Sequence, residues 1–182
     1  MTISRDQAAD ALKEIEAVAA RSKELKGYAI GAPILMMWGV ICMVGYGAGA
    51  LNPTYGAIWL PLSLVGAIAT FIMARRANRD ARDRVGPRIG WTWAALLVFY
   101  VAVFAVLRPK DPNQFAAFPA LVVALSYVLM GIWTWPRYVV LGAAVGTLTL
   151  VGYFALAPFL SLWMAIVMGG GLVLGGFWLR RA

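Results

Sequence analysis

The chain alternates between long apolar stretches and short segments that carry almost all of its charge. Six stretches contain no Asp, Glu, Lys, Arg or His, and they cover residues 28–50, 57–74, 89–107, 115–135, 138–157 and 159–179. Each is long enough to cross a hydrocarbon core of roughly 30 Å as a helix that rises ~1.5 Å per residue. Lipid offers the backbone no hydrogen-bond partner, and none of the stretches alternates as barrel strands do. We therefore predict an all-α fold, in which residues 28–182 form a polytopic membrane bundle of six transmembrane helices.

Residues 1–27 form the one soluble element that we predict, an amphipathic cytoplasmic helix. Ser4 and Gln7 have the spacing of a capping box, which satisfies exposed backbone groups, so a helix is expected to begin there. Apolar residues then recur every three or four positions and therefore share one face. The face that we predict to bind a partner consists of Leu12, Ile15, Val18, Ala19 and Leu25.

The charges of this helix bear on what it binds. Residues 1–27 hold five basic and five acidic residues, whereas helices that lie on anionic lipid are usually rich in lysine and arginine. The balance favours a cytoplasmic protein partner or a second copy of the chain. An alternative that the sequence leaves open is that the helix folds back against the cytoplasmic ends of its own membrane helices.

The distribution of lysine and arginine predicts the orientation, because positively charged segments resist transfer across the membrane. With the amino terminus inside, fourteen of the sixteen basic residues face the cytoplasm, and only Arg108 and Lys110 face outward. We therefore expect a multi-pass protein of the bacterial inner (plasma) membrane with both termini in the cytoplasm.

The segment between the second and third apolar stretches is strongly basic. Its six arginines against Asp80 and Asp83 give a net charge of +4, enough to hold anionic lipid head groups. These arginines are Arg75, Arg76, Arg79, Arg82, Arg84 and Arg88. The alternative is that they only fix the orientation of the neighbouring helices. The two aspartates lack further ligands for a metal, and no nucleic-acid-binding motif accompanies the charge, so we expect neither partner.

The composition argues against an enzyme. The chain has 182 residues but only eight acidic residues and no histidine, which leaves few groups for acid–base catalysis or metal binding. We therefore expect a protein with no enzymatic activity and no cofactor. The six apolar stretches also contain no acidic or histidine side chain of the kind that proton- and sodium-coupled carriers place at mid-depth, so any transport is expected to be uncoupled.

Glycines at four-residue spacing predict close contacts between helices, because helix backbones in lipid approach each other at small residues. The two pairs are Gly142 with Gly146 and Gly171 with Gly175. Such contacts would lie within one chain or, for the last helix, between copies in a homo-oligomer. A Leu-x-Pro motif at residues 51–53, 107–109 and 156–158 also indicates three hairpins of one repeated type, although proline is common at any helix end.

Two functions fit these features. The first is an adaptor, regulator or sensor that engages a cytoplasmic protein through the amino-terminal helix, with the membrane helices as its anchor. The second is a small uncoupled channel or exporter for neutral or lipophilic molecules, because six helices exceed what anchoring requires. Cross-linking from the amino-terminal helix separates them, since the adaptor would capture a distinct soluble protein and the channel only another copy.

Overall fold

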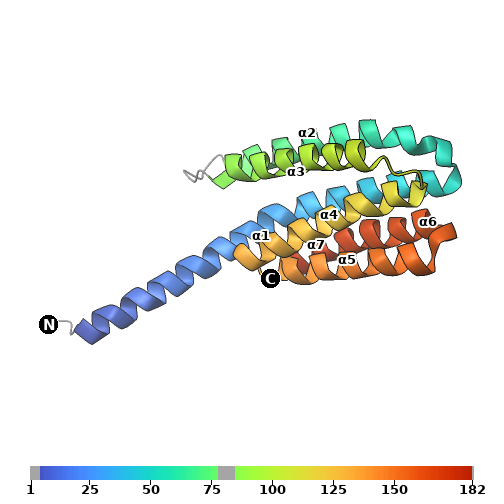
Figure 1. Cartoon of the computed structure of the whole chain (residues 1–182). Helices are drawn as coiled ribbons and strands as arrows, with labels where there is room; N and C mark the ends of the chain where they lie inside the picture. Colours follow the sequence, from blue (N-terminus) through green and yellow to red (C-terminus); the bar gives the residue numbers. More distant parts are fainter. Residues whose placement is uncertain (1–4, 78–84, 182) are drawn as a thin grey trace.

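The computed structural model describes residues 5–77 and 85–181, and all of its regular elements are helical (Figure 1). The helices are α1 (Arg5–Leu51), α2 (Trp59–Ala77), α3 (Val85–Leu107), α4 (Pro112–Trp133), α5 (Arg137–Ala155), α6 (Leu160–Met164) and α7 (Gly171–Arg180). Short 3-10 segments, η1 (Pro53–Ile58) and η2 (Ala157–Phe159), precede α2 and α6, and a π-helical segment, η3 (Ala165–Gly170), joins α6 to α7. The predicted all-α class is confirmed for the described residues.

Within the described parts of the chain, five helical segments are long and apolar enough to cross a membrane. They are Asp10–Leu51, Tyr55–Ala77, Pro112–Trp133, Arg137–Ala155 and Ala157–Arg180, and α3 adds a shorter apolar portion, Ala94–Leu107. Large apolar side chains also face outward from the bundle, among them Leu64 of α2 and Val101 of α3. An apolar outer surface of this kind is typical of a protein surrounded by lipid, so the chain has the features of a membrane protein.

The core of the bundle is built around α1. This helix packs against α7 and η3, and α4 packs against α5 in the other extensive contact between helices. Buried side chains from these helices form one cluster, which includes Ala32, Leu35, Ala120, Tyr127, Val145, Met164 and Leu172. Small residues let the backbones approach, as at Gly39, where a Cβ would lie 2.7 Å from the carbonyl oxygen of Gly169.

Helices α2 and α3 lie at the edge of the bundle and are mostly exposed. Helix α2 is attached to α1 by a hydrogen bond, in which Nε1 of Trp38 donates to Oγ1 of Thr70 at 3.0 Å. Helix α3 contacts α4 through aromatic rings, and Tyr100 stacks on Phe118 with ring centroids 6.0 Å apart. These two helices are therefore held by fewer contacts than the rest of the bundle.

The turns that follow α1 and α5 are built alike. In the first, the indole of Trp59 lies against Gly45 and meets the ring of Tyr46 edge-on, with centroids 4.8 Å apart. In the second, the indole of Trp163 lies against Gly152. A side chain at either glycine would occupy the place of the indole, so glycine is required at both positions.

Two features of the helices differ from a simple reading of the six apolar stretches. Helix α1 is continuous from Arg5 to Leu51, so the predicted division between residues 1–27 and 28–182 coincides with no break in the helix. The last stretch, expected as one regular helix, contains the π-helical turn η3. At this turn Gly169 lies directly against Met43 of α1.

Candidate functional site

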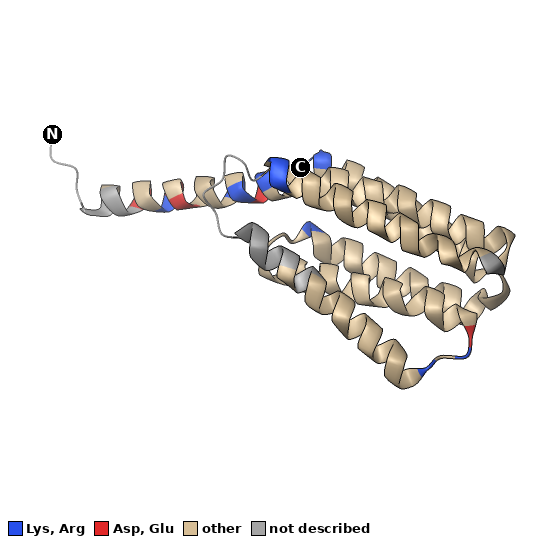
Figure 2. Cartoon of the chain, turned by 90° about the horizontal axis from the view of Figure 1, so that it is seen from above, with Lys and Arg blue, Asp and Glu red and all other residues tan. Residues whose placement is uncertain are grey.

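The amino-terminal half of α1 projects away from the bundle (Figure 1). Residues 5–26 continue the line of the helix beyond the other helices, over roughly 33 Å at ~1.5 Å per residue. The projection does not fold back on the bundle, which was one of the two alternatives from the sequence. Figure 2 shows charged residues along the projection, and their described side chains are exposed except that of Glu24, which is partly exposed at its base.

The residues predicted to bind a partner are all exposed on this projection. Leu12, Ile15, Val18 and Leu25 are 59%, 65%, 64% and 41% exposed, and Ala19 is exposed beside them. We call these five residues the apolar face. The opposite side of the helix is polar and carries the exposed ion pair between Lys13 and Asp10, at 3.9 Å. An ion pair so exposed contributes little stability, so packing of the apolar face is the main interaction that the projection can offer.

A cluster of side chains fixes α1 where it leaves the bundle. The phenol of Tyr28 is buried and donates a hydrogen bond to Oε1 of Glu24 at 2.8 Å, while the backbone N–H of Arg137 donates to the Tyr28 oxygen at 3.3 Å. The guanidinium of Arg137 donates to the backbone carbonyl oxygen of Trp178 at 3.3 Å. It also lies over the ring of Trp178, 5.2 Å from the ring centroid. The cluster joins α1 to the first turn of α5 and the last turn of α7.

Two glycines bring α1 close to the aromatic residues around this cluster. A Cβ at Gly27 would meet the indole of Trp135, and a Cβ at Gly31 would meet the hydroxyl of Tyr138. The ring of Tyr138 in turn stacks on that of Tyr28, with centroids 6.2 Å apart. Sequence reasoning missed this cluster, because Tyr28 and Arg137 are more than 100 positions apart and only the two glycines at positions 27 and 31, on either side of Tyr28, indicate it.

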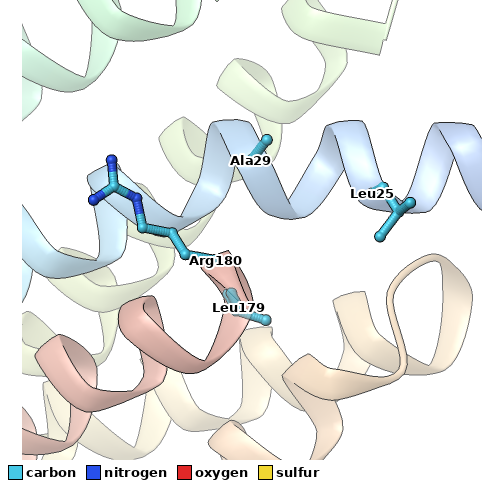
Figure 3. Close-up of a pocket in the computed structure, with 4 residues that line it drawn as sticks. All are labelled: Leu25, Ala29, Leu179 and Arg180. Atoms are coloured by element: carbon cyan, nitrogen blue, oxygen red, sulfur yellow. The ribbon is translucent and has the colours of Figure 1, made fainter. Parts of the chain in front are cut away.

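An open cavity of about 550 Å³ lies at the base of the projection, and Figure 3 shows its lining. Leu25 and Ala29 come from α1, and Leu179 and Arg180 come from the end of α7. The cavity therefore begins where α7 stops covering α1. Its lining is apolar except for Arg180, which introduces a positive charge at its edge.

The structure describes part of the basic segment between α2 and α3. Arg75 and Arg76 are exposed in the last turn of α2, and the guanidinium of Arg75 lies 4.4 Å from the ring centroid of Phe71. Arg79, Arg82 and Arg84 lie outside the described residues, and of Arg88 only the backbone, in α3, is described. Lipid head-group binding by these arginines stays a prediction.

The four predicted packing glycines have different surroundings. A Cβ at Gly142 would lie 2.5 Å from the backbone carbonyl oxygen of Ala124, and one at Gly146 would lie 3.4 Å from the Cβ of Ala124. A Cβ at Gly175 would meet Leu141 at 2.5 Å, whereas one at Gly171 would meet nothing within 4 Å. Gly142, Gly146 and Gly175 therefore lie at contacts within the chain, and Gly171 does not.

Within residues 5–77 and 85–181, no group of three His, Cys, Asp or Glu side chains could hold a metal ion. Comparisons with protein-family models, with curated protein sequences and with solved structures give no match.

Proposed function

We propose that this chain is a non-enzymatic adaptor, regulator or sensor of the bacterial inner membrane, which engages a cytoplasmic protein through the apolar face of α1. In this proposal six helices cross the membrane, and both termini lie in the cytoplasm. The observation that carries the proposal is the projecting helix, with four large apolar side chains each at least 41% exposed.

The exposed apolar side chains of the projection favour binding to a partner. Helices in proteins gain most of their stability from packing of an apolar face, and a helix in water without such packing is only marginally stable. Burial of a Leu, Ile or Val side chain stabilises by about 1.5–3 kcal/mol relative to exposure. The apolar face can therefore supply substantial binding energy to a protein that covers it.

The direction of α1 argues against the membrane surface as this partner. An interfacial helix lies in the plane of the membrane and is usually rich in lysine and arginine. Here the projection continues a membrane-spanning helix without a break, so it points away from the lipid. Its acidic and basic residues are also balanced in number, which gives little attraction to anionic lipid.

Site-specific photo-cross-linking in living cells tests the proposal. A photo-reactive phenylalanine analogue replaces Ile15 on the apolar face, and a matched variant carries it at Ala20, which is exposed on the opposite side. We expect the Ile15 variant to form one adduct with a soluble protein other than this chain, and the Ala20 variant to form none. Adducts with lipid or with this chain alone at Ile15 would contradict the proposal.

A further inference from the structure

The apolar face of the projection continues a seam that α1 already uses inside the bundle. There, α1 residues spaced by four, three and four positions contact the carboxy-terminal helix. These residues are Ala32, Met36, Gly39 and Met43, and Gly169 and Gly176 lie opposite them. A spacing that alternates between three and four is typical of helices that pack side by side as in a coiled coil.

The same spacing continues without interruption toward the amino terminus. The next positions are Ala29, Leu25, Ser22, Val18, Ile15 and Ala11, and all of them are exposed. We call the positions from Ala11 to Leu25 the open seam. Helix α7 ends at Arg180, beside Ala29, so α7 covers the seam inside the bundle and leaves the open seam uncovered (Figure 3).

Parallel packing of α1 from a second copy along the open seam is blocked by α7. The α1 of that copy would run parallel to the first and would be equally continuous as far as Leu51. Two helices packed along the seam lie 8–10 Å apart. Continued into the bundle, the second α1 would occupy the place where α7 packs on Ala32 and Gly39. A helix that packs along the open seam therefore has to end before it reaches the end of α7.

The charge at the end of α7 indicates the chemistry of that helix. Arg180 lines the cavity at the base of the projection, and Arg181 follows it as an exposed residue. Figure 3 shows the guanidinium of Arg180 extending past Ala29 on the side away from Leu25, and this exposed side chain can turn toward the membrane-proximal end of a helix placed on the open seam. Acidic side chains, or the partial negative charge of a helix carboxy terminus, are favoured next to such cations.

We infer that the open seam binds an amphipathic helix of a soluble protein, which continues the line of α7 and meets Arg180 with an acidic or carboxy-terminal end. This inference rests on the proposed function, because it specifies the partner of the same face. The occupant extends the α1–α7 contact out of the bundle by about four helical turns, at ~5.4 Å per turn.

The test compares cross-linked sites on both proteins. The photo-reactive analogue is placed separately at the exposed positions Val18, Leu25 and Arg181, with Ala20 as the control, and the linked peptides are identified by mass spectrometry. Val18 and Leu25 are seven residues apart on one helix, so a helix lying alongside α1 should be linked at two places about seven residues apart. We expect Arg181, which follows the last residue of α7, to link to the end of the same segment.

The charge complementarity is tested with Arg180→Glu, and Arg76→Glu on the exposed end of α2 serves as the matched charge reversal. Arg180→Glu should lower the adduct yield from Leu25 roughly two- to tenfold, as expected for reversal of one exposed charge, and Arg76→Glu should leave it unchanged. Linked sites about seven residues apart, with an acidic or carboxy-terminal end of the partner helix linked to Arg181, support the inference.

The outcomes separate the inference from the proposed function. Capture of a soluble protein from Val18 with no adduct from Arg181, with linked sites not spaced as on a helix, or with an Arg180→Glu yield equal to that of the control would overturn the inference alone. Capture of a second copy of this chain, or of no protein from any position, would overturn both.

Discussion

The guanidinium of Arg137 lies over the ring of Tyr28, 5.5 Å from its centroid. This contact joins the first turn of α5 to α1 at the point where α1 leaves the bundle. Tyr28 also donates a hydrogen bond to Glu24 one turn earlier in α1, so the same cluster extends from the end of the bundle to the base of the projection.

Replacing Arg137 by alanine should loosen this end of the bundle. The substitution removes the contacts with two aromatic rings and the hydrogen bond to the carbonyl oxygen of Trp178. We expect a loss of about 1–3 kcal/mol in the free energy of unfolding, given ~0.5–2 kcal/mol for each cation–π contact. Thermal unfolding in mild detergent measures it. Arg76→Ala is the control, since Arg76 is exposed at the end of α2 and its removal should cost much less.

Alanine substitutions at three glycines should have graded effects on stability. Gly142→Ala places a Cβ against a backbone carbonyl that cannot move independently, so we expect a loss of about 1–3 kcal/mol. Gly175→Ala meets only the ends of leucine side chains, which can shift, so its effect should be smaller. Gly171→Ala meets open space and should leave stability unchanged or raise it by up to about 1 kcal/mol. Equal effects at Gly142 and Gly171 would show that the α4–α5 contact differs from the one described.

These glycines also show how far the sequence predicts the structure. The four-residue spacing of Gly142 with Gly146 and of Gly171 with Gly175 is the same, yet Gly171 faces no neighbour. Spacing fixes which residues share a helix face, but the helix opposite that face depends on packing between segments far apart in the sequence. The π-helical turn before Gly171 also changes the positions of the following residues around the helix axis, compared with a regular α-helix. No local signal predicts that turn.

The helices and the apolar face were more accessible to prediction. Lipid requires each long uncharged stretch to be helical, and the three- and four-residue spacing of Leu12, Ile15 and Val18 places them on one side of any helix. What the sequence leaves open is where that side points. The continuity of α1 through Gly27 decides it, and α1 is placed there against Trp135 and Tyr138, more than 100 residues away.

The hydrogen bond between Trp38 and Thr70 should contribute to the attachment of α2. Thr70→Val keeps the shape of the side chain but leaves Nε1 of Trp38 without this acceptor. Hydrogen bonds between membrane helices contribute about 0.6–2 kcal/mol, so we expect a loss in that range. Thr70→Ser retains the hydroxyl and should behave nearly as the wild type. Thermal unfolding in mild detergent measures the change, and equal stability of the valine and serine variants would show that the bond contributes nothing.

The last prediction concerns orientation, and it follows from where the charges lie along the bundle. Figure 2 shows charged residues on the projection and at the adjacent end of the bundle, while the loop between α3 and α4 holds Arg108, Lys110 and Asp111 at the opposite end. The end of the bundle that bears the projection carries more lysines and arginines than this loop. Because positively charged segments stay in the cytoplasm, that end should be cytoplasmic and the α3–α4 loop should face the periplasm. A phosphatase that is active only in the periplasm should therefore be active when fused after Asn113 and inactive when fused after Ala77 at the end of α2. Matched expression of both fusions is confirmed by immunoblot. Activity after Ala77 with none after Asn113 would place the projecting helix in the periplasm and remove the basis for a cytoplasmic partner.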